Sequence, residues 1–331
     1  MTRRGEFALI DAFRDRLPAP HAGVVVGSGD DAAVVRAGGA LSVVSVDTTV
    51  DGVHARLELG DPRSTAEAFG WRALTTAVSD LAACGVGPGP VEAYVAVTLP
   101  PSLGDERVLA ISDGMAAAAR AYGVSVIGGD VTSGPAVVIS TTVVGWLAEG
   151  EAPLTRAGAK PGDLVGLTGP VGAGGAGLAL FLGDVDPAAL PSADAAALTD
   201  RYLRPVPHLQ AGAALRAAGA TAAIDLSDGL LADACHVARA SGVALRVEAD
   251  RVPLARGVDA AALQLGLEPL LFAQSAGEDF VLLVTVPQAA RAAAEAAGVV
   301  AWIGTVAGGP AGEVSGLPDD PTGRTGHDHR G

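Results

Sequence analysis

The fold is decided by the stretch Ala223-Ile224-Asp225-Leu226-Ser227-Asp228-Gly229. It reads as a short apolar strand that enters a turn, and a helix pattern starts at Leu230. Open α/β folds place ligands where a strand ends and a helix begins. Asp225 and Asp228 are three residues apart beside a glycine, so a tight turn can direct both carboxylates to one point, which suits a hard cation carrying phosphate. The structural alternative is that Ser227 or Asp228 caps the helix N-terminus.

Length and composition indicate a globular protein of two domains. The chain has 331 residues, and domains average roughly 150 residues. A net charge of −15 disfavours nucleic acid as a partner, because neutralising its phosphates needs a basic face. No apolar run reaches the roughly 18 residues of a membrane-spanning helix, and the N-terminus lacks the apolar block of a signal peptide. We therefore expect a cytoplasmic protein without a membrane segment.

Hydrophobic periodicity predicts alternating strands and helices in both halves. In the first half we expect strands at 41–46, 93–99 and 136–147, and helices at 64–85, with Ser64 as N-cap, and at 105–122. Near residue 149 the composition changes to a turn-rich bridge. We predict domains at 1–149 and 150–306, followed by a flexible Gly-, Pro- and Asp-rich tail at 307–331.

A glycine-rich run at 169–177 contains a partial nucleotide fingerprint. Gly172, Gly174 and Gly177 match the pattern G-x-G-x-x-G. A dinucleotide site also needs a second strand with an acidic residue about 20 positions on, and the sequence continues instead through a turn at 184–187. A nicotinamide-dependent oxidoreductase is therefore a distant alternative.

Aspartates recur at the ends of expected elements beside Gly, Ser or Thr, namely Asp30, Asp31, Asp47, Asp80, Asp130, Asp225 and Asp228. If they converge, their repulsion raises their pKa values unless cations neutralise them, so convergence implies a metal. Oxygen ligands without clustered cysteine or histidine suit Mg²⁺, which often shares its ligand shell with substrate phosphates. Walker A and kinase glycine-loop sequences are absent. The pattern thus predicts a phosphoryl-transfer enzyme of another kind.

Several of these aspartates lie in longer motifs that occur in a fixed order between about residues 5 and 306. The motifs are Gly5-Glu6-Phe7, Gly29-Asp30-Asp31-Ala32, Ser45-Val46-Asp47-Thr48, Ser79-Asp80-Leu81-Ala82-Ala83, Ile127-Gly128-Gly129-Asp130, residues 154–163, residues 224–229 and Gly277-Glu278-Asp279. As a set they make the sequence similar to the thiamine-monophosphate kinase family of the AIR-synthetase-like superfamily. The resemblance implies an α/β (α+β) fold of two domains, in which the N-terminal domain has a mixed sheet with helices on one face and the C-terminal domain is α/β.

The resemblance also implies an activity, the transfer of the ATP γ-phosphate to thiamine monophosphate, and a homodimer that pairs through its N-terminal sheets. The implied Mg²⁺ ligands are Asp31, Ser45, Asp47, Asp80, Asp130, Asp225 and Asp228, of which Asp130, Asp225 and Asp228 are the expected catalytic residues. The implied ATP contacts are Tyr122, Gly129, Asp130, Arg156 and Ser227, and the implied thiamine-phosphate contacts are His54 and Glu278. Two alternatives stay open: a superfamily relative with another phosphate acceptor, and a non-catalytic protein that binds a nucleotide or metal.

Two positions depart from the family pattern. Val46 stands where the family often has a threonine that contacts the metal, and only its backbone carbonyl can ligate. A C-terminal tryptophan that often closes over the thiamine ring is absent, because the tail reads Thr322-Gly323-Arg324-Thr325-Gly326-His327.

Overall fold

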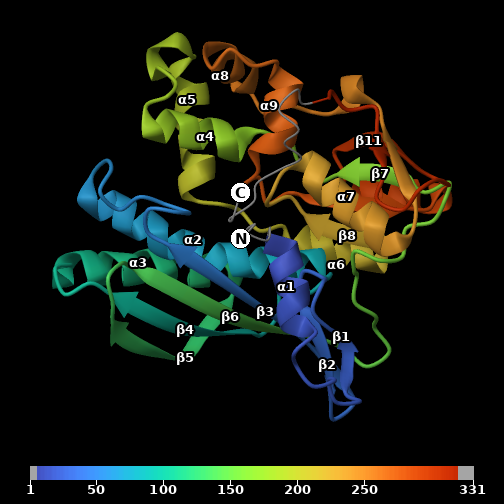
Figure 1. Ribbon diagram of the computed structural model, residues 1–331, viewed down its shortest axis with the longest axis horizontal. Coiled ribbons are helices and arrows are strands. Elements are labelled where there is room, and N and C mark those ends of the chain that lie inside the picture. The colour runs from blue at the N-terminus through green and yellow to red at the C-terminus, as the bar shows by residue number, and fades with distance from the viewer. Residues whose placement is uncertain (1–5, 320–331) are drawn as a thin grey trace.

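The chain forms two halves, each built on a mixed six-stranded sheet (Figure 1). The computed structural model describes residues 6–319. This arrangement confirms the expected two-domain α/β fold. Within the described residues, no helix is both long enough and apolar enough to cross a bilayer.

The first half contains a sheet with strand order β1-β2-β3-β6-β4-β5. Its strands are β1 (Val24–Val26), β2 (Ala33–Ala37), β3 (Ala40–Val50), β4 (Val91–Leu99), β5 (Val124–Ser133) and β6 (Val138–Leu147). Neighbouring strands are antiparallel except β4 and β5. Helices α2 (Pro62–Ala83) and α3 (Asp105–Tyr122) cover one face, and α1 (Glu6–Arg14) lies beside the sheet (Figure 1). No helix among residues 6–319 covers the other face, which is called the bare face below.

Helix α2 is the central element of the molecule. It packs on the first sheet and on α3, and it also contacts β8 and α6 of the second half. Its apolar residues are therefore buried nearly all round, as a helix between two layers requires. Two polar side chains of α2, Arg72 and Asp80, lie against residues of the second half, at the site described below.

The second half has a sheet with strand order β12-β9-β11-β7-β10-β8. Its strands are β7 (Leu164–Leu167), β8 (Ala222–Asp225), β9 (Ala244–Val247), β10 (Leu282–Val286), β11 (Ala301–Ala307) and β12 (Val314–Ser315). Its helices are α4 (Ala173–Leu182), α5 (Ser192–Leu203), α6 (Leu209–Ala217), α7 (Leu230–Ser241), α8 (Val258–Gln264), α9 (Pro269–Ala276) and α10 (Arg291–Ala296). Single 3₁₀ turns lie at Pro187–Ala189, Ala249–Arg251 and Gln288–Ala290. Helices α4, α5, α8 and α9 pack together at the upper left of Figure 1.

Two sequence expectations need correction. The helix expected to start at Ser64 begins at Pro62, so Ser64 lies inside α2 and is not its N-cap. The tail expected to be flexible from residue 307 contains β12, which pairs with β9, and the Gln274 amide donates to the Pro318 carbonyl at 2.7 Å. Residues 320–331 lie outside the described range. The boundary between 149 and 150 stays a prediction.

Candidate active site

Three carboxylates from separate elements meet between the two halves. Asp31 precedes β2 and Asp80 lies near the end of α2, whereas Asp225 ends β8 in the second half. One oxygen atom of each lies within 4.8 Å of the others. The junction between β8 and α7, at residues 225–229, therefore faces carboxylates of the first half across the interface. A shared cation site requires this arrangement.

Electrostatics at this cluster favour a bound cation. Burial raises the pKa of Asp31 to about 7, although the Arg156 guanidinium opposes the shift. Burial also raises the pKa of Asp80 and of Asp225, and the neighbouring carboxylates raise that of Asp80 further. Oδ2 of Asp31 is buried and has no hydrogen-bond partner among the described residues. An oxygen-only donor set with an orphaned carboxylate oxygen fits Mg²⁺.

Other residues expected at the site lie around this cluster. The Ser45 hydroxyl donates to the Asp80 carboxylate. Nη2 of Arg156 donates to Oδ1 of Asp31 at 2.7 Å, and the Arg156 backbone N–H donates to Oδ2 of Asp30 at 3.0 Å. Arg156 thus joins the start of the second half to the Gly-Asp-Asp turn of the first.

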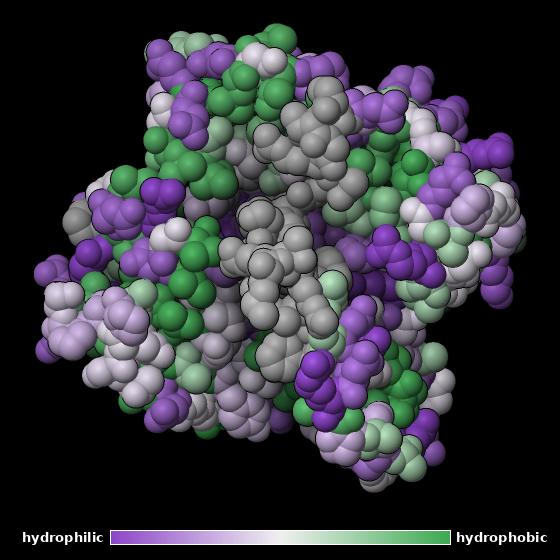
Figure 2. Space-filling model, viewed as in Figure 1, coloured by the Kyte–Doolittle hydropathy of each residue, from purple (hydrophilic) through white to green (hydrophobic). Residues whose placement is uncertain are grey.

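A cavity of about 200 Å³ is lined by residues of both halves. The first half contributes Asp47, His54 and Arg72, and the second half contributes Asp228 and Glu278. On the face shown in Figure 2, hydrophilic residues are visible where the two halves meet. The structure therefore brings two expected cation ligands, Asp47 and Asp228, together with the expected substrate contacts His54 and Glu278, into one cavity.

His54 and Glu278 are held in defined orientations in this cavity. Nδ1 of His54 accepts the Val50 N–H at 3.1 Å, so a neutral His54 ring carries its proton on Nε2. The Glu278 backbone has a φ of 65°, which is rare for a residue with a side chain, and its N–H donates to the Ser227 carbonyl at 2.8 Å. The Glu278 loop and the Ser227 loop thus support each other.

Arg72 is a site residue that the sequence reasoning missed. Its side chain is 2% exposed and donates to the Glu278 carboxylate and to the Tyr202 carbonyl. It is a cationic side chain in the lining of this cavity. The sequence does mark this position, because Arg72 is a lone charge within the apolar run Phe69 to Leu74.

The N-cap of α7 is Gly229, which has no side chain to cap the helix. The structural alternative for Ser227 and Asp228 is therefore wrong. Instead, the backbone N–H groups of Asp228 and Gly229 each donate to Oδ2 of Asp233 at 3.2 Å.

The glycine-rich junction between β7 and α4 has a structural role. Oδ2 and Oδ1 of the buried Asp279 accept the N–H groups of Gly172 and Gly174 at 2.7 and 3.0 Å. A Cβ atom on Gly174 would lie 2.2 Å from the Glu278 carbonyl oxygen. A carboxylate of the protein thus fills the place of a pyrophosphate at this helix start, and this packing disfavours the nicotinamide alternative.

Asp130 and Gly129 lie apart from the carboxylate cluster within one chain. They belong to the edge strand β5, three strands from β3, or about 14 Å at the usual strand spacing. Asp130 pairs with Ala96, Ala96 with Ser140, and Ser140 with Thr48, so its side chain lies on the sheet face opposite to that of Asp47. The role of Asp130 as a cation ligand stays a prediction.

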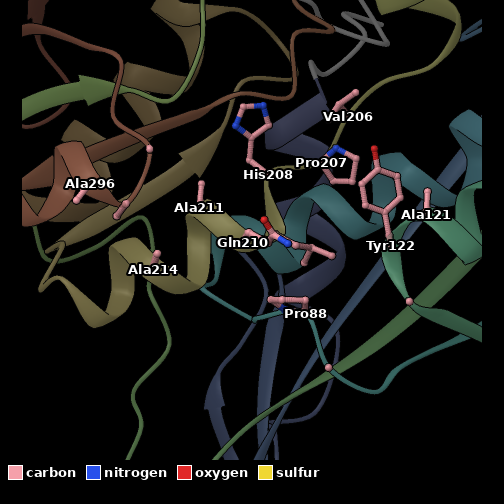
Figure 3. Close-up of a pocket in the computed structure, with 15 residues that line it drawn as sticks. Pro88, Ala121, Tyr122, Val206, Pro207, His208, Gln210, Ala211, Ala214 and Ala296 are labelled. Carbon is pink, nitrogen blue, oxygen red and sulfur yellow. The ribbon is translucent and has the colours of Figure 1, made fainter.

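Tyr122 also lies elsewhere, in a separate cavity of about 770 Å³ that contains Pro207 and His208 (Figure 3). Its ring makes an edge contact with Trp71 at 5.9 Å between ring centroids. Since this cavity shares no lining residue with the one containing Asp47, the structure does not bring Tyr122 to the carboxylates. Its expected contact with ATP stays a prediction.

Comparison with known proteins agrees with this geometry. Residues 29–147 match the family described as AIR synthase related protein, N-terminal domain, and residues 160–316 match its C-terminal domain. The thiamine-monophosphate kinase of Salmonella typhimurium is 38% identical over 298 residues, which cover 88% of this chain and 86% of the relative. The chain belongs to the thiamine-monophosphate kinase family. The enzyme of that name from Mycobacterium tuberculosis is also 38% identical, over 84% of this chain and 80% of its own.

Solved structures of thiamine-monophosphate kinases share the fold. A structure described as AaThiL complexed with AMPPCP and TMP is 30% identical and covers 99% of both chains with a TM-score of 0.84. The kinase from Aquifex aeolicus is 28% identical with a TM-score of 0.78 and covers 95% of this chain and 98% of its own. The complex shows that a member of this family binds an ATP analogue together with TMP.

Proposed function

We propose that this protein transfers the γ-phosphate of ATP to thiamine monophosphate, giving thiamine diphosphate and ADP. The observation that carries the proposal is the meeting of Asp31, Asp80 and Asp225 across the two halves, beside the cavity that contains His54 and Glu278. Membership of the thiamine-monophosphate kinase family and the nucleotide-bound relative support it.

The carboxylates are proposed to hold Mg²⁺. Asp31, Asp80 and Asp225 supply the cluster, Ser45 lies against Asp80, and Asp47 and Asp228 both line the adjoining cavity. Bound Mg²⁺ would neutralise the phosphate charge that must accumulate when two anions react. The protein in turn fixes the positions of both substrates, which is the larger part of catalysis in phosphoryl transfer.

No strong general base is needed in this reaction. A phosphate monoester is already anionic near neutral pH, so one of its oxygens can attack the γ-phosphorus directly, in line with the departing ADP. We assign Ser227 and Arg156 to ATP, and His54 and Glu278 to thiamine monophosphate. Arg72 holds Glu278 in place, because the two side chains form an ion pair in which the arginine is almost completely buried.

A homodimer is proposed through the bare face of the first sheet. Val46, Tyr94 and Trp146 project from this face and are 65%, 43% and 41% exposed. Exposed apolar side chains on one bare sheet face are typical of an interface. Asp130 lies on the same face, so pairing of two sheets would also bury its surroundings. Light scattering should give the mass of a dimer, and a monomer at working concentration would contradict this part.

The activity is tested by identifying products. Incubation with ATP, Mg²⁺ and thiamine monophosphate should give the phosphorus NMR signals of thiamine diphosphate and ADP, and a chelator should abolish them. Consumption of ATP without thiamine diphosphate would indicate another phosphate acceptor. Absence of any ATP turnover, with nucleotide binding retained, would indicate a non-catalytic protein.

A further inference from the structure

The loop formed by residues 226–229 carries two of the proposed site residues, Ser227 and Asp228, and it ends at an N-cap residue that has no side chain. Gly229 is the N-cap of α7 with a φ of 119°, a conformation that favours glycine. A loop of this kind can direct Asp228 toward the cavity only if its backbone is fixed by other groups.

Asp233 fixes it. This residue lies one turn into α7 and is 2% exposed. Its Oδ2 atom accepts the N–H groups of Asp228 and of Gly229, each at 3.2 Å, and its own N–H donates to the Gly229 carbonyl at 3.0 Å. Asp233 therefore binds the backbone of Asp228 and Gly229 through both its side chain and its own N–H group.

Burial of a carboxylate costs free energy unless hydrogen bonds or opposite charges compensate for it. Here the cost is increased, because an oxygen of the Asp228 carboxylate lies within 4.8 Å of an oxygen of Asp233 and the two like charges repel each other. An apolar residue at position 233 would fill the interior without this repulsion. A carboxylate in such a place indicates a role in geometry more than in stability.

We propose that Asp233 is a positioning residue, which holds the 226–229 loop by its backbone so that Ser227 and Asp228 present their side chains to the Mg²⁺–nucleotide. This inference rests on the proposed function for the identity of the ligand. Asp233 itself acts through the loop and does not touch the substrate. Its essential property is the hydrogen-bond acceptor at Oδ2.

Two variants separate the role of Asp233 as a hydrogen-bond acceptor from the role of its negative charge. Asp233→Asn keeps one carbonyl oxygen that can accept both N–H groups, whereas Asp233→Ala leaves both buried donors without a partner. Asp259→Ala is a matched control, since Asp259 is also in the first turn of a helix of this half but is exposed.

The measurement is calorimetric binding of AMPPCP with Mg²⁺, supplemented by KM values for ATP and for thiamine monophosphate. Asp233→Ala should weaken nucleotide binding about 10- to 100-fold, as expected for a residue that orients a ligand. It should raise the KM for ATP while leaving the KM for thiamine monophosphate within about threefold. Asp233→Asn and Asp259→Ala should bind AMPPCP within about threefold of the wild type.

Equal damage by Asp233→Asn and Asp233→Ala would overturn the proposal, since the negative charge would then be what matters. Unchanged nucleotide binding in Asp233→Ala would overturn it as well. If Asp233→Ala does not fold, amide exchange in Asp233→Asn decides the question: the Asp228 and Gly229 amides should stay protected, and rapid exchange would overturn the proposal. Because AMPPCP binding requires no acceptor, these results stand apart from any failure to form thiamine diphosphate.

Discussion

Two strand-to-helix junctions of the second half resemble each other in position but differ in use. At both, a buried carboxylate accepts two backbone N–H groups: Asp279 at the junction of β7 and α4, and Asp233 at the junction of β8 and α7. The first junction matches a nucleotide fingerprint in sequence, and the second does not.

The difference lies in the other side chains of each turn. Gly172 and Gly174 have no side chain to offer a ligand, and the space that a Cβ would need is occupied by Ala273 and Val258 at Gly172 and by the Glu278 backbone at Gly174. At the second junction the backbone is fixed in the same way, but Asp225 and Asp228 extend toward the carboxylates and the cavity. Glycine spacing shows that backbones approach closely, whereas the polar side chains beside them decide whether a ligand binds.

The largest effect is expected from the second junction. Asp225→Asn should lower turnover by about 10²- to 10³-fold, the size typical of losing one preorganised electrostatic contact. The metal-free variant should melt no lower than the wild type, because one of three mutually repelling carboxylates has been removed. A coupled assay for ADP release and a thermal melt measure the two quantities. Near-normal turnover would remove Asp225 from the site.

A substitution at the junction of β7 and α4 should lower the free energy of unfolding. Gly174→Ala places a Cβ 2.2 Å from the Glu278 carbonyl oxygen, so the backbone must shift, at a cost of about 3 kcal/mol in the free energy of unfolding. Gly308→Ala is a matched control, since no atom lies within 4 Å of its added Cβ. Urea denaturation compares them. Equal stability of the two variants would show that this junction is not tightly packed.

A smaller effect follows from the pKa of Asp31, which lies at about 7 in the fold and near 3.8 in the unfolded chain. Between these values the native state binds the additional proton, so without metal this group lowers stability as pH rises. Asp31→Asn should therefore gain about 2 kcal/mol relative to the wild type from pH 5.5 to 7.5, at ~1.4 kcal/mol per pH unit.

Urea denaturation in a chelator measures this difference. His208 and His236, with pKa values of about 4, give an opposite trend below about pH 6.5, but they cancel in the comparison of the two proteins. Mg²⁺ should stabilise the wild type more at pH 7.5 than at pH 5.5, since it competes with protons. A difference that does not change with pH would mean that Asp31 is ionised throughout.

The last prediction is an absence of binding and concerns NADH. NADH should not bind, because Asp279 already occupies the N–H groups of Gly172 and Gly174. Fluorescence titration with NADH, with AMPPCP and Mg²⁺ as the positive control, measures this. Saturable NADH binding that Gly174→Ala abolishes would contradict the structural role of the junction of β7 and α4.

Much of the fold follows from local patterns, since α3 spans the expected residues 105–122 and the motif order indicates two domains. The carboxylate cluster was predictable because each aspartate stands at an element end beside small or hydroxyl residues. Arg72 was not predicted, because its acceptor Glu278 is 206 residues away and only packing brings the two together. Asp233 was not predicted either, because it accepts the N–H of Asp228, five residues before it, only once the turn has folded. Asp130 is the opposite case. It belongs to a recognisable sequence motif, but within a single chain it lies on the opposite sheet face from Asp47.

The central claim is that carboxylates of the two halves share a cation, and a double-mutant cycle tests it most directly. The Mg²⁺ concentration for half-maximal turnover is measured in the wild type, Asp31→Asn, Asp225→Asn and the double variant. If the residues share one ion, the double variant should need at least about tenfold less additional Mg²⁺ than the product of the single effects predicts, a coupling of about 1.4 kcal/mol. Single effects that multiply without coupling would contradict a shared site.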